Sequence, residues 1–359
     1  MEIKENNNTK ESRELGRFIL RVALALVPLA VFLALYLTLD PFGVVHPYSG
    51  VSVHAGDSLE HIPNKRYVAV EGLDYYIGER HYDSFIFGSS LSTNFTAAAW
   101  SRHLPADASI YHFTAGAEPL EGIRDELRYL FDRGVQVRHV LMVMEEEMYR
   151  RPKRYNEMPY VPHYKVSPEV SWLDFHRVHF NAYRDPELFL YSLFPSLVAD
   201  RLVPDGKMQP VPVSGHDELI NEDRNDAKDS LILSDPDAYF SEVPWLVEMR
   251  ALPNPMPSVV TGESEHLLRE IADMLREHQV DYQVIVPPRF RTQGLQAVDR
   301  AMLHEILGRR HVHDFSNDSV LVHDLHSYYD GMHILIHRCT ELIDRSYRES
   351  ELPLQYPGD

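Results

Sequence analysis

Two serines that follow a short apolar run are the first residues that could carry chemistry. The run at residues 85–87 is typical of a buried strand, and a helical pattern occupies residues 91–104. Gly88, Ser89 and Ser90 lie between them, where backbone N–H groups and the helix dipole point outward. Such a corner can hold a nucleophile whose oxyanion the N–H groups stabilise, or it can bind a phosphate. A third interpretation is that a serine simply caps the helix.

An aspartate and a histidine near the C-terminus, Asp330 and His333, stand three residues apart at the start of an expected helix, about residues 331–348. At that spacing on one helical turn their side chains share a face. The carboxylate can then accept the Nδ1 proton and leave Nε2 free toward a serine, which needs such a base to become nucleophilic. Alternatively, Asp330 is only a cap and His333 only a surface residue. The chemistry depends on the fold bringing this pair to Ser90.

Strand and helix patterns alternate on both sides of a long irregular stretch. This order predicts an α/β protein, a three-layer α/β/α sandwich with a mostly parallel sheet and right-handed crossovers. In that architecture ligands lie outside the C-terminal ends of the strands, where both candidate motifs fall. The expected strands cover residues 85–87, 109–113, 140–144, 282–286 and 311–315, and the expected helices cover 91–104, 119–134, 262–278, 295–307 and 331–348.

The irregular stretch, about residues 145–258, is a large insertion rich in aromatic residues and prolines. It contains one convincing helical pattern at residues 186–202 and an acidic run at residues 217–237, which we expect to be a mobile surface loop. Its aromatic side chains suit stacking on sugar rings in a lid or acceptor groove, but they equally suit a small core of its own. The basic residues within 150–154 either neutralise the glutamates at 145–147 or bind an anionic polymer.

The N-terminal segment predicts a membrane anchor. Residues 1–17 are polar, and residues 18–39 form an apolar run with eighteen uncharged positions from Val22 to Leu39. Basic residues precede the run, so the positive-inside rule places residues 1–17 in the cytoplasm and the rest of the chain outside it. No small-residue cleavage site follows, which favours an uncleaved single-pass anchor over a signal peptide. Residues 40–78 are interpreted as linker and lead-in, 79–348 as the α/β domain, and 349–359 as a C-terminal tail.

The composition of the 359-residue chain excludes several classes of function. A net charge of −19 argues against nucleic acid as a partner. The single cysteine, Cys339, excludes an internal disulfide and fits an apolar helical stripe. Among the many histidines, His323 and His326 with Asp324 imitate a ligand set, but no second well-spaced set accompanies them. We therefore expect no metal and no cofactor.

The two motifs together resemble the SGNH (GDSL-type) hydrolases. The resemblance rests on a strand ending in Gly88-Ser89-Ser90-Leu91 and on Asp330-x-x-His333, and it covers about residues 80–145 and 262–348. It implies a flavodoxin-like sheet, with Ser90 as nucleophile and His333 and Asp330 as base and orienting acid. It also implies oxyanion and substrate contacts from the corner, at Gly88 and Ser89, and from the second strand-end loop at Gly116. The family usually adds an asparagine from the third loop, where this chain has glutamates at residues 145–147.

The Gly-Ser-Ser corner and the anchor are most similar to a membrane-anchored branch of that family. Members of the D-alanyl-lipoteichoic acid and alginate-acetylation types transfer acyl groups onto envelope polymers beside a multi-span acyl exporter. The resemblance therefore implies an extracytoplasmic O-acyltransferase or esterase that acts on a polysaccharide or similar polymer through an acyl-enzyme on Ser90. The missing asparagine leaves open a catalytically silent domain that binds glycan or serves as a scaffold in a membrane acylation complex.

Overall fold

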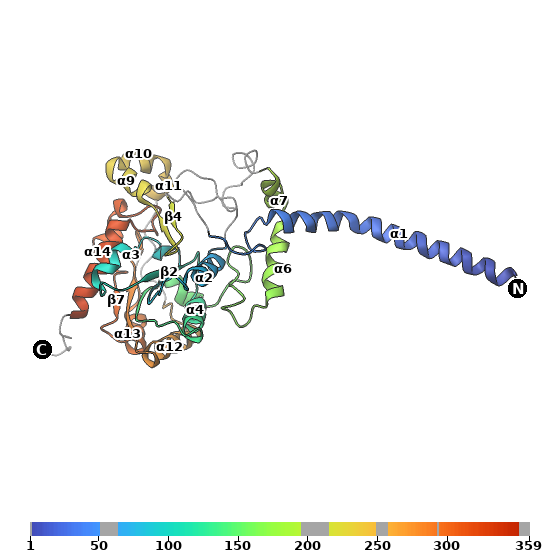
Figure 1. Ribbon diagram of the computed structural model, residues 1–359. Helices are drawn as coiled ribbons and strands as arrows, with labels where there is room; N and C mark the ends of the chain where they lie inside the picture. Colours follow the sequence, from blue (N-terminus) through green and yellow to red (C-terminus); the bar gives the residue numbers. More distant parts are fainter. Residues whose placement is uncertain (1, 51–63, 195–214, 249–257, 293, 352–359) are drawn as a thin grey trace.

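The computed structural model describes residues 2–50, 64–194, 215–248, 258–292 and 294–351, and its centre is a five-stranded sheet (Figure 1). All neighbouring strands of this sheet are parallel, in the order β2-β1-β3-β6-β7. Along the chain this is the 2-1-3-4-5 order of doubly wound folds. The α/β class and the parallel sheet are thus confirmed. The strands are β1 (Ser84–Gly88), β2 (Ile110–Thr114), β3 (His139–Val143), β6 (Asp281–Val286) and β7 (Val312–Asp314).

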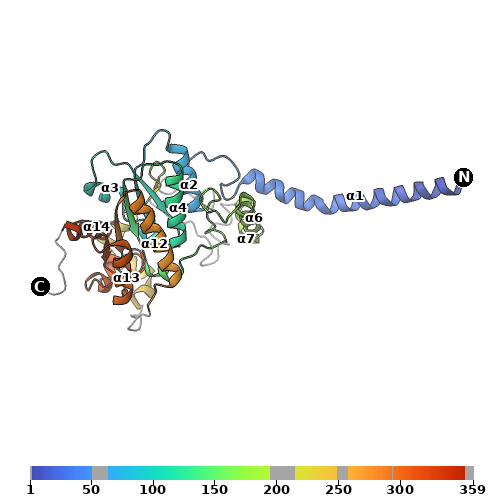
Figure 2. The same cartoon turned by 90° about the horizontal axis from the view of Figure 1, so that it is seen from below.

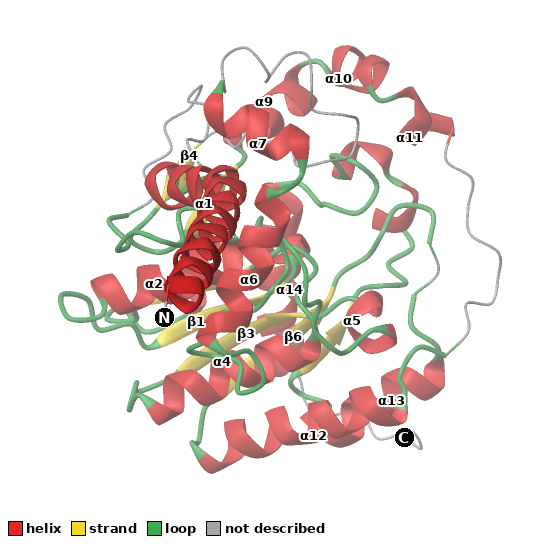
Figure 3. Ribbon diagram, turned by 90° about the vertical axis from the view of Figure 1, so that its right-hand side faces the viewer, coloured by secondary structure: helices red, strands yellow, loops and turns green. Residues whose placement is uncertain are grey.

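Helices cover both faces of the sheet. On one face, α2 (Lys65–Tyr76), α4 (Leu120–Asp132), α12 (Gly262–Glu277) and α13 (Ala297–Leu307) pack over a core that includes Phe85, Phe87 and Met142. Figure 3 shows α4, α12 and α13 on that side of the strands. On the other face, α3 (Ala97–Trp100) and α14 (Ile336–Glu351) cover a second core that includes Ile86 and Leu141. Successive strand residues point to opposite faces, so both faces of the apolar runs are buried.

The strand order reverses between β1 and β3, and their C-terminal ends lie level. Gly88 is in register with Thr114 on β2 and with Val143 on β3. A ligand site in a doubly wound sheet forms at such a reversal, outside the carboxyl ends of the strands. The Gly88-Ser89-Ser90 corner therefore lies where this architecture places its sites.

The segment after the corner differs from the single helix expected at residues 91–104. It forms the 3₁₀ turn η1 (Ser90–Ser92), the short α3 and a second 3₁₀ turn, η2 (Ser101–His103). The Ser92 hydroxyl donates to the Ser89 carbonyl, and Thr96 caps α3 by accepting from the Ala99 N–H. Side chains that bond the local backbone compete with a continuous helix, which explains the break.

The expected last helix also begins later than predicted. Helix α14 starts at Ile336, and Asp330 and His333 lie in the loop before it. In this loop Tyr328 and Ile334 form an isolated bridge, and Gly331 has a φ of 84°, which glycine adopts readily. The turns η3 (Leu321–His323) and η4 (Leu325–Ser327) precede the loop.

Two segments contain more ordered structure than the sequence indicated. The lead-in at residues 40–78 contributes α2, whose Leu73 is fully buried against the sheet. The acidic run at residues 217–237 is not a loop but contains a hairpin and two helices. The insertion comprises α5 (Glu146–Arg150), α6 (Trp172–Tyr183), α7 (Pro186–Leu193), β4 (Gly215–Asp217), β5 (Glu222–Arg224), α9 (Asp226–Ser234), α10 (Pro236–Glu242) and α11 (Pro244–Glu248). The expected helix at residues 186–202 is described only as far as α7, and residues 195–202 lie outside the described part.

Helix α1 (Glu2–Leu39) extends away from the rest of the protein (Figures 1 and 2). An 18-residue window within its segment Arg13–Leu39 has a mean hydropathy of 2.6, and the segment is long and apolar enough to span a membrane. Most of its apolar side chains are exposed, and among the described residues only its C-terminal turns pack against other helices. The helix expected at residues 18–39 is therefore present.

Candidate active site

The fold brings Ser90 and the Asp330–His333 pair together. His333 Nε2 lies 2.8 Å from Ser90 Oγ, although 243 residues separate them in the chain. His333 Nδ1 lies 2.7 Å from Asp330 Oδ2. All three residues are partly exposed, so none is sealed inside the protein. This is the geometry of a serine nucleophile, a histidine base and an orienting carboxylate.

The carboxylate fixes the tautomer of the histidine. An ionised Asp330 can only accept hydrogen bonds, so Nδ1 carries the proton and Nε2 accepts the hydrogen bond from the Ser90 hydroxyl. Burial raises the pKa of Asp330, but hydrogen bonds from the His333 ring and from the Met332 and His333 N–H groups outweigh it and lower that pKa. The acid therefore stays ionised at neutral pH, as its role as an acceptor requires.

The pair is held by a turn of the loop, not by the helical turn that the spacing suggested. Asp330 Oδ1 accepts from the N–H of Met332 at 3.1 Å and from the N–H of His333 at 2.9 Å. An aspartate that bonds the backbone two and three residues ahead forms its own tight turn. This turn directs Oδ2 at the imidazole. The three-residue spacing therefore does bring Asp330 and His333 together, but through a loop turn and not through a helical turn.

Close packing explains the glycine of the corner. A Cβ on Gly88 would lie 2.7 Å from Ser92 Cβ and 2.8 Å from the Val143 carbonyl oxygen, too close for any side chain. The corner leads into a 3₁₀ turn of three residues and not into a long helix, so no extended helix dipole points at Ser90. Within the described residues, neither the Ser90 N–H nor the Gly116 N–H donates a hydrogen bond. Neither N–H group is therefore committed to a hydrogen-bond partner in this part of the structure.

Ser89 has a structural role. Its side chain is buried, its hydroxyl donates to Glu145 Oε1 at 2.5 Å, and its oxygen accepts from the Leu91 N–H. Glu145 follows β3, where the SGNH pattern has its asparagine. Burial raises the pKa of Glu145, while the Ser89 hydrogen bond and the charges of Arg289 and His333 act to lower it. A carboxyl group therefore lies close to His333 at the end of β3.

Arg289, from the loop after β6, brings a cation to the same edge of the sheet. Its Nη2 donates to Met332 Sδ, and its buried Nε has no hydrogen-bond partner within the described residues. A thioether is a weak acceptor, so little of the donor capacity of this guanidinium is used. Arg289 can therefore bind or stabilise a negative charge near Ser90 and His333. In the sequence, only its place at a strand end marks this residue.

The loop that carries Asp330 and His333 is held in place by residues outside the two sequence motifs. Asn94 Nδ2 donates to the Ile334 carbonyl at 2.6 Å and so joins the serine corner to this loop. Asp229, on α9 of the insertion, accepts from the Tyr329 hydroxyl and from the Ile336 N–H. The insertion therefore supports the site from behind, a role that residue spacing along the chain cannot indicate.

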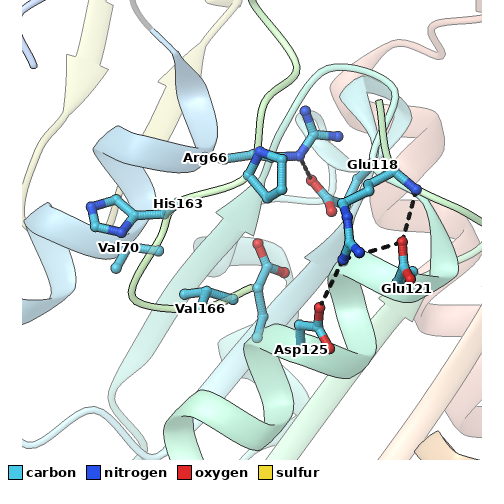
Figure 4. A pocket seen from close by; sticks show the side chains of 11 residues that line it. Arg66, Val70, Glu118, Glu121, Asp125, His163 and Val166 are labelled. Carbon is cyan, nitrogen blue, oxygen red and sulfur yellow. Dashed lines mark hydrogen bonds and ion pairs between the residues drawn. The ribbon is translucent and has the colours of Figure 1, made fainter. Parts of the chain in front are cut away.

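The loop that carries Gly116 rests on a buried charge cluster (Figure 4). Arg66 Nη2 donates to the carbonyls of Gly116 and Ala117, and Arg66 Nε lies 2.7 Å from Glu118 Oε2. Both side chains of this pair are buried. Beside them is a cavity of about 10 Å³, also lined by Glu126. The second strand-end loop is thus held by α2, which lies in the segment expected to be linker and lead-in.

The remaining sequence motifs form ordinary structural contacts. Arg150 and Arg151 pair with Glu146 and Glu147 within and beyond α5, Lys153 pairs with Glu263, and Arg154 pairs with Glu121 and Asp125. The interpretation that these cations neutralise nearby acids therefore fits the structure. Cys339 is buried and free. No group of three or more potential ligands is arranged to hold a metal in the part of the chain that the structure describes.

Comparison of the chain with protein-family models and with curated proteins found no match.

Proposed function

We propose that this protein is an SGNH-type serine esterase or O-acyltransferase that works through an acyl-enzyme on Ser90. The observation that supports this most is the continuous hydrogen-bonded chain from Ser90 Oγ through His333 to Asp330, at 2.8 and 2.7 Å. Its position at the strand-order reversal between β1 and β3 suits a ligand site.

The chemistry proceeds by double displacement. Ser90 Oγ attacks the carbonyl carbon of an ester or thioester as its proton passes to His333 Nε2, and the carbonyl oxygen becomes an oxyanion. When the tetrahedral intermediate collapses, the bond to the leaving group breaks and His333 donates its proton to that group. An acceptor hydroxyl, or water, then loses a proton to His333 and attacks the acyl-enzyme. When the second tetrahedral intermediate collapses, the acyl group leaves as an ester, or as a carboxylic acid if water attacked, and His333 returns its proton to Ser90 Oγ.

The oxyanion would be stabilised by a donor set that departs from the family pattern. The N–H groups of Ser90 and Gly116 are available, and the Arg289 guanidinium supplies a positive charge at the same strand ends. Arg66 donates to the Gly116 and Ala117 carbonyls and so holds the loop directly after the Gly116 N–H. Glu145 can donate only in its protonated form, which its burial favours.

We further propose that α1 is an uncleaved membrane anchor that holds the α/β domain outside the cytoplasm. The support is the length and apolarity of Arg13–Leu39 together with the basic residues before it. Such a placement suits an envelope polysaccharide or similar polymer as the acyl acceptor and a multi-span acyl exporter as the partner that delivers the acyl group.

An activity-based probe tests the enzyme directly. A fluorophosphonate forms a covalent bond only with an activated serine, so it should label the purified full-length protein. Labelling should disappear in Ser90→Ala. The matched control is Ser101→Ala, which removes an exposed hydroxyl on η2 and should leave labelling intact.

A second candidate is a catalytically silent domain that binds glycan or serves as a scaffold. The observation that favours it is Glu145, an acid where the family pattern has an oxyanion donor. Folded protein that the fluorophosphonate does not label, but that binds an envelope polysaccharide, would support this candidate and contradict the enzyme.

A further inference from the structure

Two helices of the insertion contact the end of the apolar helix. The Phe32 ring on α1 lies 5.6 Å from Phe180 and 4.9 Å from Tyr183 on α6, and 5.4 Å from Phe189 on α7. Tyr36, one turn later, lies 5.3 Å from Phe180 and is buried. Five aromatic rings therefore join α1 to α6 and α7, and the junction has the character of a core.

The junction lies inside the apolar run and not beyond it. Phe32 is seven residues before Leu39, the last residue of the uncharged stretch. At a rise of about 1.5 Å per residue, Phe32 lies about 10 Å short of the end of that stretch. With α1 as a membrane anchor, whatever contacts Phe32 must lie at or below the headgroup level of the outer leaflet.

The orientation of α6 and α7 suits that depth. Figures 1 and 2 show both helices beside the C-terminal end of α1, with α6 lying across its axis. A helix that lies across a membrane-spanning helix runs along the plane of the bilayer. Interfacial helices adopt this orientation, with their apolar side chains about 5–10 Å into the boundary between headgroups and acyl chains.

These two helices also expose large apolar side chains that no described residue covers. Trp172 and Leu173, at the start of α6, are 58% and 65% exposed. Leu190 on α7 and Phe194 directly after it are 38% and 51% exposed. Tryptophan is enriched at membrane interfaces, where its ring lies at the headgroup level. Leu190 belongs to the same helix as Phe189, so exposed apolar surface and the contact with α1 lie on one short element.

We propose that α6 and α7 form a membrane-binding platform that inserts into the outer leaflet around the end of α1. Its occupant is the lipid bilayer, and the inference rests on the proposed anchor but not on the proposed catalysis. The platform makes α6 and α7 the part of the insertion that contacts the membrane. It holds the α/β domain against the membrane surface at a fixed height and orientation, whereas a single helix alone would leave the domain free to swing.

Depth-dependent quenching in nanodiscs tests the platform with the full-length protein. Leu190→Cys receives an NBD fluorophore, and the lipids carry a doxyl quencher on the upper part of the acyl chain. Cys339 is fully buried and does not compete for the label. The matched control is Val298→Cys on α13, an apolar side chain that is 56% exposed and far from α1 in sequence. A third variant, Leu26→Cys, reports on α1 itself.

The proposal expects the probe at residue 190 to lose about half of its fluorescence or more, as a site within the upper acyl region should, while the probe at residue 298 keeps it. Equal quenching at residues 190 and 298, with strong quenching at residue 26, would overturn the platform and leave the anchor intact. Absence of quenching at residue 26 would overturn the anchor and the platform together. Fluorophosphonate labelling of the same samples reports on the catalytic proposal independently.

Discussion

Replacing Asp330 by asparagine tests the proton assignment at the candidate site. The amide oxygen of asparagine can still accept from the Met332 and His333 N–H groups, so the turn of the loop should survive. The amide nitrogen, however, would face His333 Nδ1 at the 2.7 Å position that the carboxylate oxygen now holds. Because an amide N–H₂ only donates, it selects the tautomer with the proton on Nε2. In that tautomer Nε2 cannot accept the Ser90 proton.

The expected loss of activity in Asp330→Asn depends on how much the correct tautomer of His333 contributes to the rate. In serine proteases, where the acid is buried, the same change lowers kcat by about 10⁴ because the histidine takes the wrong tautomer. The Asp330 side chain is 40% exposed, so solvent already screens part of its charge, but the tautomer argument is independent of burial. We expect a loss of about 10³–10⁴, equivalent to about 4–5.5 kcal/mol in the activation barrier. Hydrolysis of a p-nitrophenyl ester and the rate of fluorophosphonate labelling both measure it.

A matched control shows whether removing any carboxylate that contacts a histidine has the same effect. Asp344 Oδ1 lies 2.7 Å from His103 Nε2, outside the candidate site, and Asp344→Asn should leave both rates unchanged. If Asp330→Asn retains activity within tenfold of the wild type while Ser90→Ala abolishes it, the assigned roles of Asp330 and His333 are wrong.

Three further predictions concern the surroundings of the site. Glu145→Gln preserves the acceptor for the Ser89 hydroxyl but removes the negative charge that forms as pH rises through the raised pKa of Glu145. We therefore expect kcat to increase by about tenfold or more at alkaline pH, because this charge opposes the oxyanion. A decrease in kcat would contradict the position assigned to Glu145. Burial raises the pKa of Asp229 from 3.8 to about 6; the folded state therefore binds more protons in that window, and stability should fall by up to about 3 kcal/mol as pH rises through it. The stability of Asp229→Asn, measured by urea unfolding, should not decline in this window. If its stability depends on pH as strongly as that of the wild type, Asp229 is not the source of the decline. Arg66→Met leaves the buried Glu118 without its ion-pair partner and should lower the free energy of unfolding by about 3–5 kcal/mol. A second change, Glu118→Gln, should restore part of that stability. If thermal unfolding of the double variant shows no such recovery, the ion pair is not the source of the lost stability.

The strands of the sheet and the motifs around Ser90 and His333 could be predicted from residue types and their spacing alone. Uninterrupted apolar runs such as residues 85–87 and 140–144 are typical of strands buried on both faces, and the runs alternate with helical patterns, so the parallel α/β class followed from local periodicity. The motifs around Ser90 and His333 could be recognised because each is a short stretch whose side chains follow strand ends. Apolar length alone identified α1.

How these residues are held in place depends on the three-dimensional packing. The break after Ser92 and the late start of α14 depend on side chains that bond the local backbone, and these compete with helix formation in ways that periodicity does not reveal. Asn94, Asp229 and Arg66 support the site across 240, 107 and 50 residues of chain, and nothing in their own neighbourhoods marks them. Contacts at such separations depend on how complete elements pack, because side chains so distant in the chain become neighbours only after the sheet and its helices have assembled. Hydrophobic periodicity is a local property of the sequence, whereas the geometry of the site is a property of the assembled layers.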